Sequence, residues 1–204
     1  MSPARASYRE RQRAELREAI ARTALRLFAE HGFDNVNTEA IAAEVGISLS
    51  TLFRHVESKE DLLVRPLLHG RAQIVDNFAA RPADEPVTTS LAKAILLRTE
   101  QFAAETETVR QWRTAMHSAP AAIQRASIIG ADERVRLVAL AADRMGVDPA
   151  QDLRPGVLVR MMFAAADHAF ELWLDGGTRT PLHELTTQVL AYAGAALPEP
   201  GAVR

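Results

Sequence analysis

Apolar side chains recur every three or four positions near the start of the chain. Within residues 12–31 they stand at Leu16, Ile20, Ala24, Leu27 and Phe28. This spacing follows the period of an α-helix and predicts an amphipathic helix there. Gly32 comes directly after it, where glycine is typical of a left-handed helix end.

Three residues with short polar side chains predict the starts of the next helices. Asn37, Ser48 and Ser58 can each accept a hydrogen bond from a backbone N–H of the turn that follows. The predicted helices run over about 38–45, 49–56 and from 59 onward. Gly46 ends the first of them, and Pro66 predicts a kink or break near residues 64 and 65 of the last.

The remainder of the chain continues the helical pattern. Further helices are expected at about 87–104, 106–117, 119–145, 152–174 and 181–197. No stretch alternates strictly between apolar and polar residues, as a half-buried strand would. The sequence therefore predicts an all-α protein of about nine helices.

Residues 38–57 have the pattern of a helix-turn-helix. Ala42 is small where two helices would cross, and Gly46 permits the backbone conformation of a tight turn. Burying the apolar positions between the two helices leaves an outward face with Leu49, Ser50, Thr51, Phe53, Arg54 and His55. A short helix displayed in this way fits the DNA major groove. An ordinary pair of packed helices in a bundle shares the same spacing, so the pattern alone leaves both readings open.

The wider segment from Ala14 to Leu63 resembles the N-terminal domain of the TetR family of transcriptional regulators. The resemblance rests on a combination of motifs: Phe28–Gly32–Phe33, Ile41-Ala42, Gly46-Ile47-Ser48, Thr51-Leu52-Phe53, His55 and Ser58-Lys59-Glu60. The sequence departs from the family pattern at Asn37, Phe53 and Val56, where Thr, Tyr and Phe are usual. The resemblance implies a DNA-binding domain over 1–57, with an N-terminal arm, and a helical ligand-binding and dimerisation domain over 58–200.

Nine residues are candidate DNA contacts: Thr38, Ser48, Leu49, Ser50, Thr51, Phe53, Arg54, His55 and Lys59. Lys59 begins a helix, where its ammonium and nearby backbone N–H groups can together meet a phosphate. Leu49 has no polar group, so its use on DNA would be contact with a thymine methyl. The alternatives are a solvated lysine and a merely exposed leucine. Arg54 can serve as a phosphate contact or as an ion-pair partner.

The last two predicted helices carry apolar stripes suited to a dimer interface. A single recognition helix reads only a few base pairs, so specific binding usually needs a dimer on a pseudo-palindrome. The candidate interface residues are Val157, Met161, Ala165, Leu185, Val189 and Tyr192. In the TetR family these two helices form the dimer bundle, and the resemblance implies a homodimer here.

The resemblance also implies a pocket for a small-molecule effector in the larger domain. The candidate lining residues are Phe102, Trp112, Met116, His117, Met162 and Phe163. Methionine and aromatic side chains suit an adaptable apolar cavity. Each of them could equally be an ordinary core residue.

Composition narrows the function. The 204 residues include no cysteine and carry a net charge of −2, so there is no disulfide framework and no uniformly basic surface for nucleic acid. Five arginines stand against two glutamates in the first 17 residues, as expected of a flexible arm for the minor groove or of a solvated helical extension. No apolar stretch approaches the roughly 20 residues of a membrane span, and from the charged N-terminal residues we expect no signal peptide.

No catalytic, phosphate-binding or metal-binding motif is present, which argues against an enzyme and against a bound cofactor or metal. We therefore expect a cytoplasmic regulator, with a repressor as the default. As a homodimer it would bind a double-stranded DNA operator and be released by a small-molecule effector of unknown identity. An activator and a ligand-independent DNA-binding protein of the same fold are the alternatives.

Overall fold

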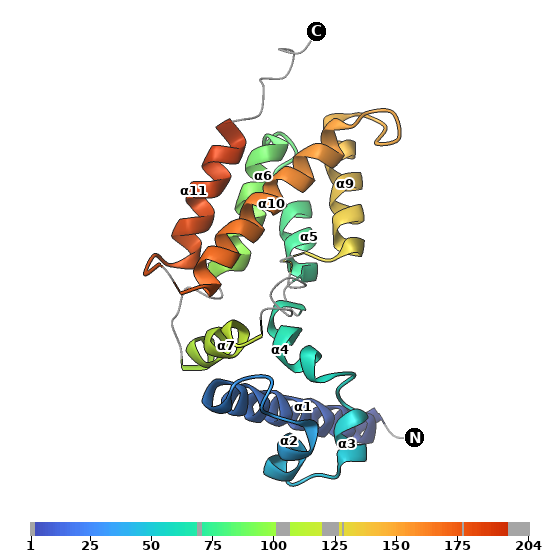
Figure 1. Cartoon of the computed structure of the whole chain (residues 1–204). Helices are drawn as coiled ribbons and strands as arrows, with labels where there is room; N and C mark the ends of the chain where they lie inside the picture. Colours follow the sequence, from blue (N-terminus) through green and yellow to red (C-terminus); the bar gives the residue numbers. More distant parts are fainter. Residues whose placement is uncertain are drawn as a thin grey trace. The chain divides into compact units, whose positions relative to one another are not determined.

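The computed structural model describes residues 3–68, 71–100, 107–119, 127, 129–176 and 178–195. Within these ranges every regular element is a helix, which confirms the predicted all-α class (Figure 1). Ten helices are described: α1 (Pro3–His31), α2 (Thr38–Val45), α3 (Leu49–Phe53), α4 (Lys59–Leu68), α5 (Arg71–Ala79), α6 (Val87–Thr99), α7 (Glu107–His117), α9 (Ala131–Met145), α10 (Arg154–Leu174) and α11 (Leu182–Ala195).

The predicted caps form as the sequence indicates. Asn37 accepts from the backbone N–H of Ala40 at 2.8 Å, Ser48 accepts from Thr51 at 3.2 Å, and Ser58 accepts from Asp61 at 3.1 Å. Gly32 and Gly46 have φ of 82° and 78°, a conformation that strains a residue with a Cβ. Because these signals are local, the boundaries of α2 match the prediction at both ends.

Five helix boundaries differ clearly from the prediction, and one of them is the end of α6, at Thr99 rather than near residue 104. The first helix begins at Pro3 rather than near residue 12, so the arginine-rich segment is a helical extension. The recognition helix ends at Phe53 because the N–H of Arg54 turns to Thr51 at 3.2 Å and that of His55 to Leu52 at 2.8 Å. These short bonds tighten the last turn.

The other two differences concern proline and glycine. Helix α4 continues through Pro66 to Leu68, so there is no break near residues 64 and 65, while the alternative of a kink stays a prediction; α5 begins at Arg71. The single helix expected over 119–145 is wrong, because Gly130 is extended (φ −83°, ψ 174°) and caps a separate helix that begins at Ala131.

The chain packs as two compact units. The first combines Met1–Pro66 with Glu105–Ala126, and the second combines Leu67–Ala104 with Ser127–Arg204. Helix α7 therefore packs with the N-terminal helices and lies against α1 in the first unit. The division into 1–57 and 58–200 stays a prediction for the functional domains.

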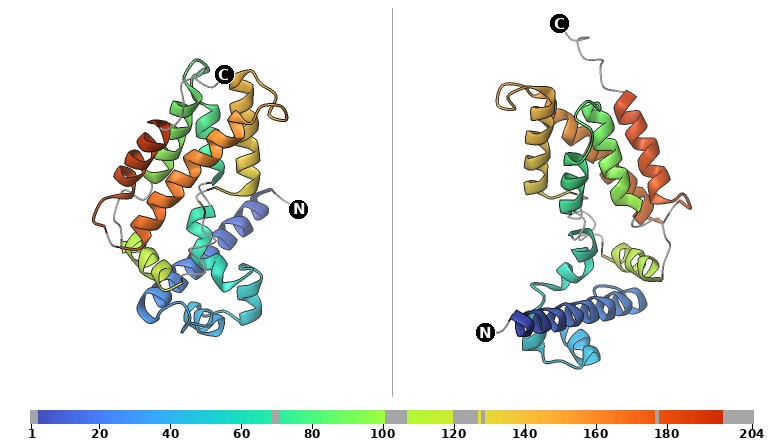
Figure 2. Two further views of the ribbon diagram at one scale, coloured as in Figure 1. Left: turned by 45° about the horizontal axis from the view of Figure 1, so that its top comes forward. Right: turned by 180° about the vertical axis from the view of Figure 1, so that it is seen from behind.

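The second unit has two layers. Helix α10 packs between α9 and α11, while α5 and α6 form the other layer, α5 against α9 and α6 against α11 (Figure 2). Large apolar side chains of α10 fill the space between the layers, among them Phe163, Phe170 and Trp173.

A guanidinium fixes the end of α5 within this unit. Arg144 donates to the carbonyls of Phe78 and Arg81, both at 2.8 Å, and to the hydroxyl of Ser90 at 2.9 Å. The last carbonyls of a helix lack partners within the helix, so a cation placed there stabilises the end. Glu85 beside it accepts from Arg81 and Lys93, which holds α5, the following loop and α6 together.

Candidate nucleic-acid interface

The turn between α2 and α3 is fixed by backbone hydrogen bonds. The N–H of Ile47 donates to the carbonyl of Ala42 at 2.9 Å, and that of Gly46 donates to Ala43 at 3.1 Å. Ile41 and Leu52 are fully buried beneath the turn. The turn and these two anchors set the direction of α3 relative to α2.

The exposed side of α3 carries a row of polar groups. The hydroxyl of Ser48 lies 3.0 Å from that of Ser50 and 2.9 Å from that of Thr51. The guanidinium of Arg54 donates to the Thr51 hydroxyl at 3.0 Å. Exposed hydroxyls and a guanidinium in one row are groups that donate to phosphates and to base edges.

The structure brings the predicted DNA contacts together on α2, α3 and the start of α4. Ser48, Ser50, Phe53 and Arg54 are exposed, while the others are half-buried: Thr38, Leu49, Thr51, His55 and Lys59. Phe53 has 51% of its surface exposed, so about half of this side chain is available for contact with DNA. Leu49 keeps only part of its side chain free for contact with a base.

Lys59 has a role within the protein that its sequence position does not reveal. Its ammonium donates to the carbonyls of Phe33 at 2.7 Å and Val36 at 2.9 Å. It also lies 4.2 Å from the centroid of the Phe33 ring. Lys59 therefore ties the start of α4 to the loop between α1 and α2. An ammonium has three hydrogens, so one remains for the predicted phosphate contact.

The same loop is held from α7. The backbone N–H of Phe33 donates to the hydroxyl of Ser118 at 2.9 Å, and the ring of Phe33 packs 5.0 Å from that of Phe28. The indole N–H of Trp112 donates to the carbonyl of Leu63 in α4 at 2.7 Å. These contacts join residues 49 and 85 positions apart in the chain, and no local sequence pattern predicts such a pairing.

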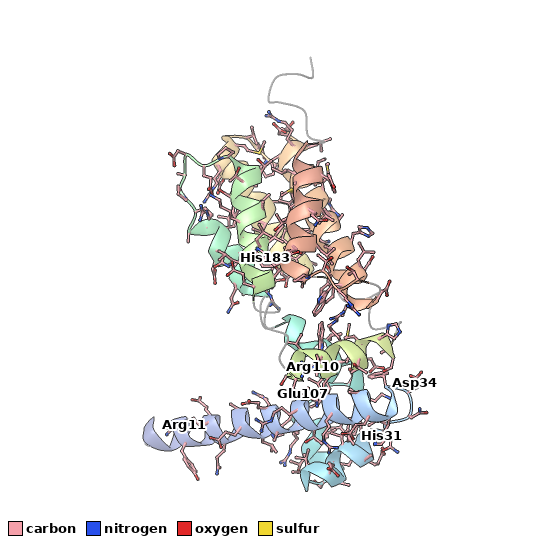
Figure 3. All side chains as sticks on the ribbon, turned by 90° about the vertical axis from the view of Figure 1, so that its left-hand side faces the viewer. Arg11, His31, Asp34, Glu107, Arg110 and His183 are labelled. Carbon is pink, nitrogen blue, oxygen red and sulfur yellow. The ribbon has the colours of Figure 1, made fainter. Side chains whose placement is uncertain are left out.

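Helix α1 is joined to the helix-turn-helix by charge. Arg26 donates to Glu30 at 2.9 Å and to Glu44 of α2 at 2.5 Å. These carboxylates, Glu30 first, raise the pKa of the Arg26 guanidinium above its ordinary value. Figure 3 shows Arg11 near the N-terminal end of α1, with His31 and Asp34 at its other end, where the chain turns toward α2.

The predicted dimer residues form a partly exposed stripe on α10 and α11. Val157 and Tyr192 have 48% and 73% of their surface exposed. Met161, Ala165, Leu185 and Val189 are half-buried. The two helices pack on each other, so all six residues lie on one packed pair of helices.

The predicted effector residues are divided between the two units. Trp112 and Met116 are buried in the first unit and Met162 and Phe163 in the second, while His117 is exposed. Phe102 lies outside the described residues. Within the described ranges no cluster of His, Asp or Glu could hold a metal ion, and none of the helices found there is long and apolar enough to cross a membrane.

Comparisons with known proteins bear on both parts of the chain. Residues 20–65 match the model of bacterial regulatory proteins of the tetR family, and residues 85–198 match that of the MftR C-terminal domain. The HTH-type transcriptional regulator TcmR of Streptomyces glaucescens is 28% identical over 176 residues, which are 81% of this chain and 76% of TcmR.

Solved structures share the fold. NalD, the secondary repressor of the MexAB-OprM multidrug efflux pump in Pseudomonas aeruginosa, aligns with a TM-score of 0.62 at 18% identity, over 89% of this chain and 96% of its own. SmeT, the repressor of the Stenotrophomonas maltophilia multidrug efflux pump SmeDEF, aligns with a TM-score of 0.59 at 16% identity, over 91% of each chain.

Proposed function

The chain belongs to the TetR family of bacterial regulatory proteins, and from this premise we propose that it is a ligand-responsive repressor that binds a pseudo-palindromic operator as a homodimer. Members of the family are DNA-binding transcriptional regulators, not enzymes. The repressor role, the form of the operator and release by an effector are the proposed part.

The exposed polar face of α3 is the observation that carries the proposal. Ser48, Ser50 and Arg54 present donors in a row, and Lys59 follows at the start of α4. Hydroxyl and guanidinium donors position a protein on phosphates, whereas Leu49 and Ser50 at the start of α3 are placed to select bases. Substitutions of the phosphate-contacting donors should therefore change the overall affinity for DNA, whereas substitutions of Leu49 or Ser50 should change the sequence preference.

Dimerisation is supported by the apolar stripe on α10 and α11. An exposed tyrosine and an exposed valine on one strip favour a second copy of the chain as the covering surface, because large apolar patches on a monomer usually belong to interfaces. A two-fold axis through such a strip presents two recognition helices to two half-sites.

Repression is the regulatory outcome we favour. An operator that overlaps a promoter blocks polymerase by occupancy alone, and NalD and SmeT, which share this fold, are repressors. We propose that the effector is small and largely apolar. It would lower operator affinity roughly 5–150-fold, the range of coupling between two sites on one protein.

The test begins with DNA selection from a random library by the full chain. We expect the selected DNA to contain an inverted repeat. In a fluorescence anisotropy titration, the protein should bind the two half-sites of this repeat cooperatively. Leu49→Ala should relax the preference at one base-pair position in each half-site, by about 1 kcal/mol. Leu153→Ala, at an exposed leucine of the second unit, should leave the selected motif unchanged.

Two results would contradict the proposal. A selected site without two-fold symmetry excludes the dimeric reading, and an identical motif for Leu49→Ala excludes base reading by that side chain. A thermal-shift screen against a metabolite panel then tests the effector. Compounds that raise the melting temperature should also release the selected operator.

A further inference from the structure

A groove of about 540 Å³ runs between α9 and α10 in the second unit. Its lining residues belong to α9, to the N-terminal turns of α10 and to the loop that joins the two helices; Figure 1 shows where these elements lie. Cavities of this size hold small organic molecules. None of its lining residues is a candidate for DNA binding, effector binding or dimerisation.

The long wall of the groove is apolar. Val135, Val138 and Ala139 of α9 line it, and Pro149 and Ala150 of the loop close it. Val135 has 71% of its surface exposed, which leaves apolar area for a ligand to cover. The lining of α9 extends from Ala131 to Ala139, a length of about 12 Å at the rise of an α-helix.

Gly156 keeps the opposite wall open. It lies within α10, and a Cβ built on it meets no atom within 4 Å. The position has no need of glycine on backbone grounds, because its φ is not in the left-handed region. A side chain at this position would therefore project into free space and fill the groove without straining the helix.

Two guanidiniums give the groove its charge. Arg134 of α9 and Arg160 of α10 both line it, and neither makes an ion pair or hydrogen bond through its side chain in the described part of the chain. By contrast, Arg81 and Arg154 of the same unit are paired with Glu85 and Asp152. The described lining contains no carboxylate. The groove thus combines an apolar wall with two unpaired cations.

We propose that this groove binds an amphipathic organic anion. The carboxylate of the ligand lies on Arg134 and Arg160, whose planar guanidiniums suit carboxylate oxygens. The hydrocarbon part of the ligand covers Val135, Val138 and Ala139. An unbranched chain of about ten carbons matches the 12 Å of α9, from Ala131 to Ala139, that lines the groove. Charge selects this occupant over a neutral apolar molecule, since a ligand without an anion leaves both guanidiniums unpaired.

Isothermal titration of the full chain with decanoate tests the proposal. We expect saturable binding of one decanoate per chain, below its micelle concentration, and binding at least tenfold weaker for decan-1-ol and for decylammonium. The double variant Arg134→Gln with Arg160→Gln should weaken decanoate binding at least tenfold. Arg136→Gln is the matched control, because Arg136 is exposed on the same helix outside the groove, and it should bind as the unchanged chain does.

Gly156→Leu provides a test by filling the groove. It should abolish decanoate binding while the melting temperature does not fall, and the arginine variants keep the test valid if this variant folds poorly. Decanoate binding that survives both changes, decanol binding of equal strength, or no binding to the unchanged chain would each overturn the proposal. Dissociation of the dimer by Gly156→Leu in light scattering would also overturn it, because it would show that a second copy covers the groove.

Discussion

Replacing Lys59 with methionine should weaken both the first unit and its binding to DNA. Methionine keeps most of the length of the side chain but removes the ammonium. Three interactions are lost: hydrogen bonds to the carbonyls of Phe33 at 2.7 Å and Val36 at 2.9 Å, and the contact with the Phe33 ring at 4.2 Å. Together these contacts join α4 to the loop that leads into α2.

The size of the effect on stability follows from these contacts. A hydrogen bond to a charged group contributes about 1.5–3 kcal/mol when it is well buried. Lys59 is half-buried, so water can partly replace the ammonium, and about 1 kcal/mol for each bond is the appropriate figure. The ring contact adds about 0.5 kcal/mol. The total of about 2.5 kcal/mol corresponds to a fall in melting temperature of roughly 5–10 °C for a chain of this length.

The effect on DNA binding is measured separately, as the dependence of affinity on salt. If the third ammonium hydrogen meets a phosphate, Lys59→Met removes one phosphate contact. The slope of log K against log salt concentration should then become less steep by about 1. Arg179→Met is the control, because Arg179 is an exposed cation of the second unit, and neither its slope nor its melting temperature should change.

The two readouts can fail independently. An unchanged melting temperature for Lys59→Met would refute the stabilising role of the contacts with Phe33 and Val36. A lowered melting temperature with an unchanged salt slope would refute the phosphate contact and leave Lys59 as a residue that only positions the helix-turn-helix.

Two further substitutions test other parts of the molecule. Val189→Asp places a charge in the apolar stripe of α11, so light scattering should show monomers, which bind a half-site but lose cooperative binding to the inverted repeat. The control Thr187→Asp, at an exposed position of the same helix, should remain dimeric. A dimeric Val189→Asp variant would contradict the proposed interface. Hydrogen bonds from Arg81, and next from Lys93, hold the pKa of Glu85 well below its usual range. The ionised carboxylate therefore stabilises the fold at pH values above about 4.3, the pKa of glutamate in the unfolded chain. This stabilisation declines as the pH falls below that value. Glu85→Gln should therefore lower the urea midpoint at pH 7 and differ less from the unchanged chain at pH 3, and an equal deficit at both values would refute the assignment.

The accuracy of the sequence-based predictions depended on how local each signal was. Asn37, Gly46 and Ser48 act within one turn of their own positions, and the boundaries of α2 and the start of α3 followed from them. The helix expected over 119–145 failed at Gly130, because the periodic apolar positions continue on both sides of a residue whose extended backbone breaks the helix. Periodicity reports the buried face of a segment but does not show whether the segment is continuous.

The contacts of Arg144 and Lys59 could not be predicted for a different reason. Each cation donates hydrogen bonds to backbone carbonyls. Every residue has a backbone carbonyl, so the sequence does not show which residue accepts the bond. The carbonyls that Arg144 reaches, at Phe78 and Arg81, lie 66 and 63 positions away in the chain. Only the folded arrangement of α5 and α9 brings them to the guanidinium.

Trp112 illustrates how the structure changes the meaning of a candidate residue. The sequence favours it as part of an apolar effector pocket, and its indole has a single N–H. That N–H is donated to the carbonyl of Leu63 in α4. Leu63 lies three residues before Pro66, and proline has no N–H to donate to the carbonyl of Leu62 one turn earlier. An effector that touches Trp112 therefore finds the only N–H of the indole already donated. A ligand that moved the ring would also release a carbonyl of α4 beside the proline, on the helix whose first residue, Lys59, holds the loop that enters α2.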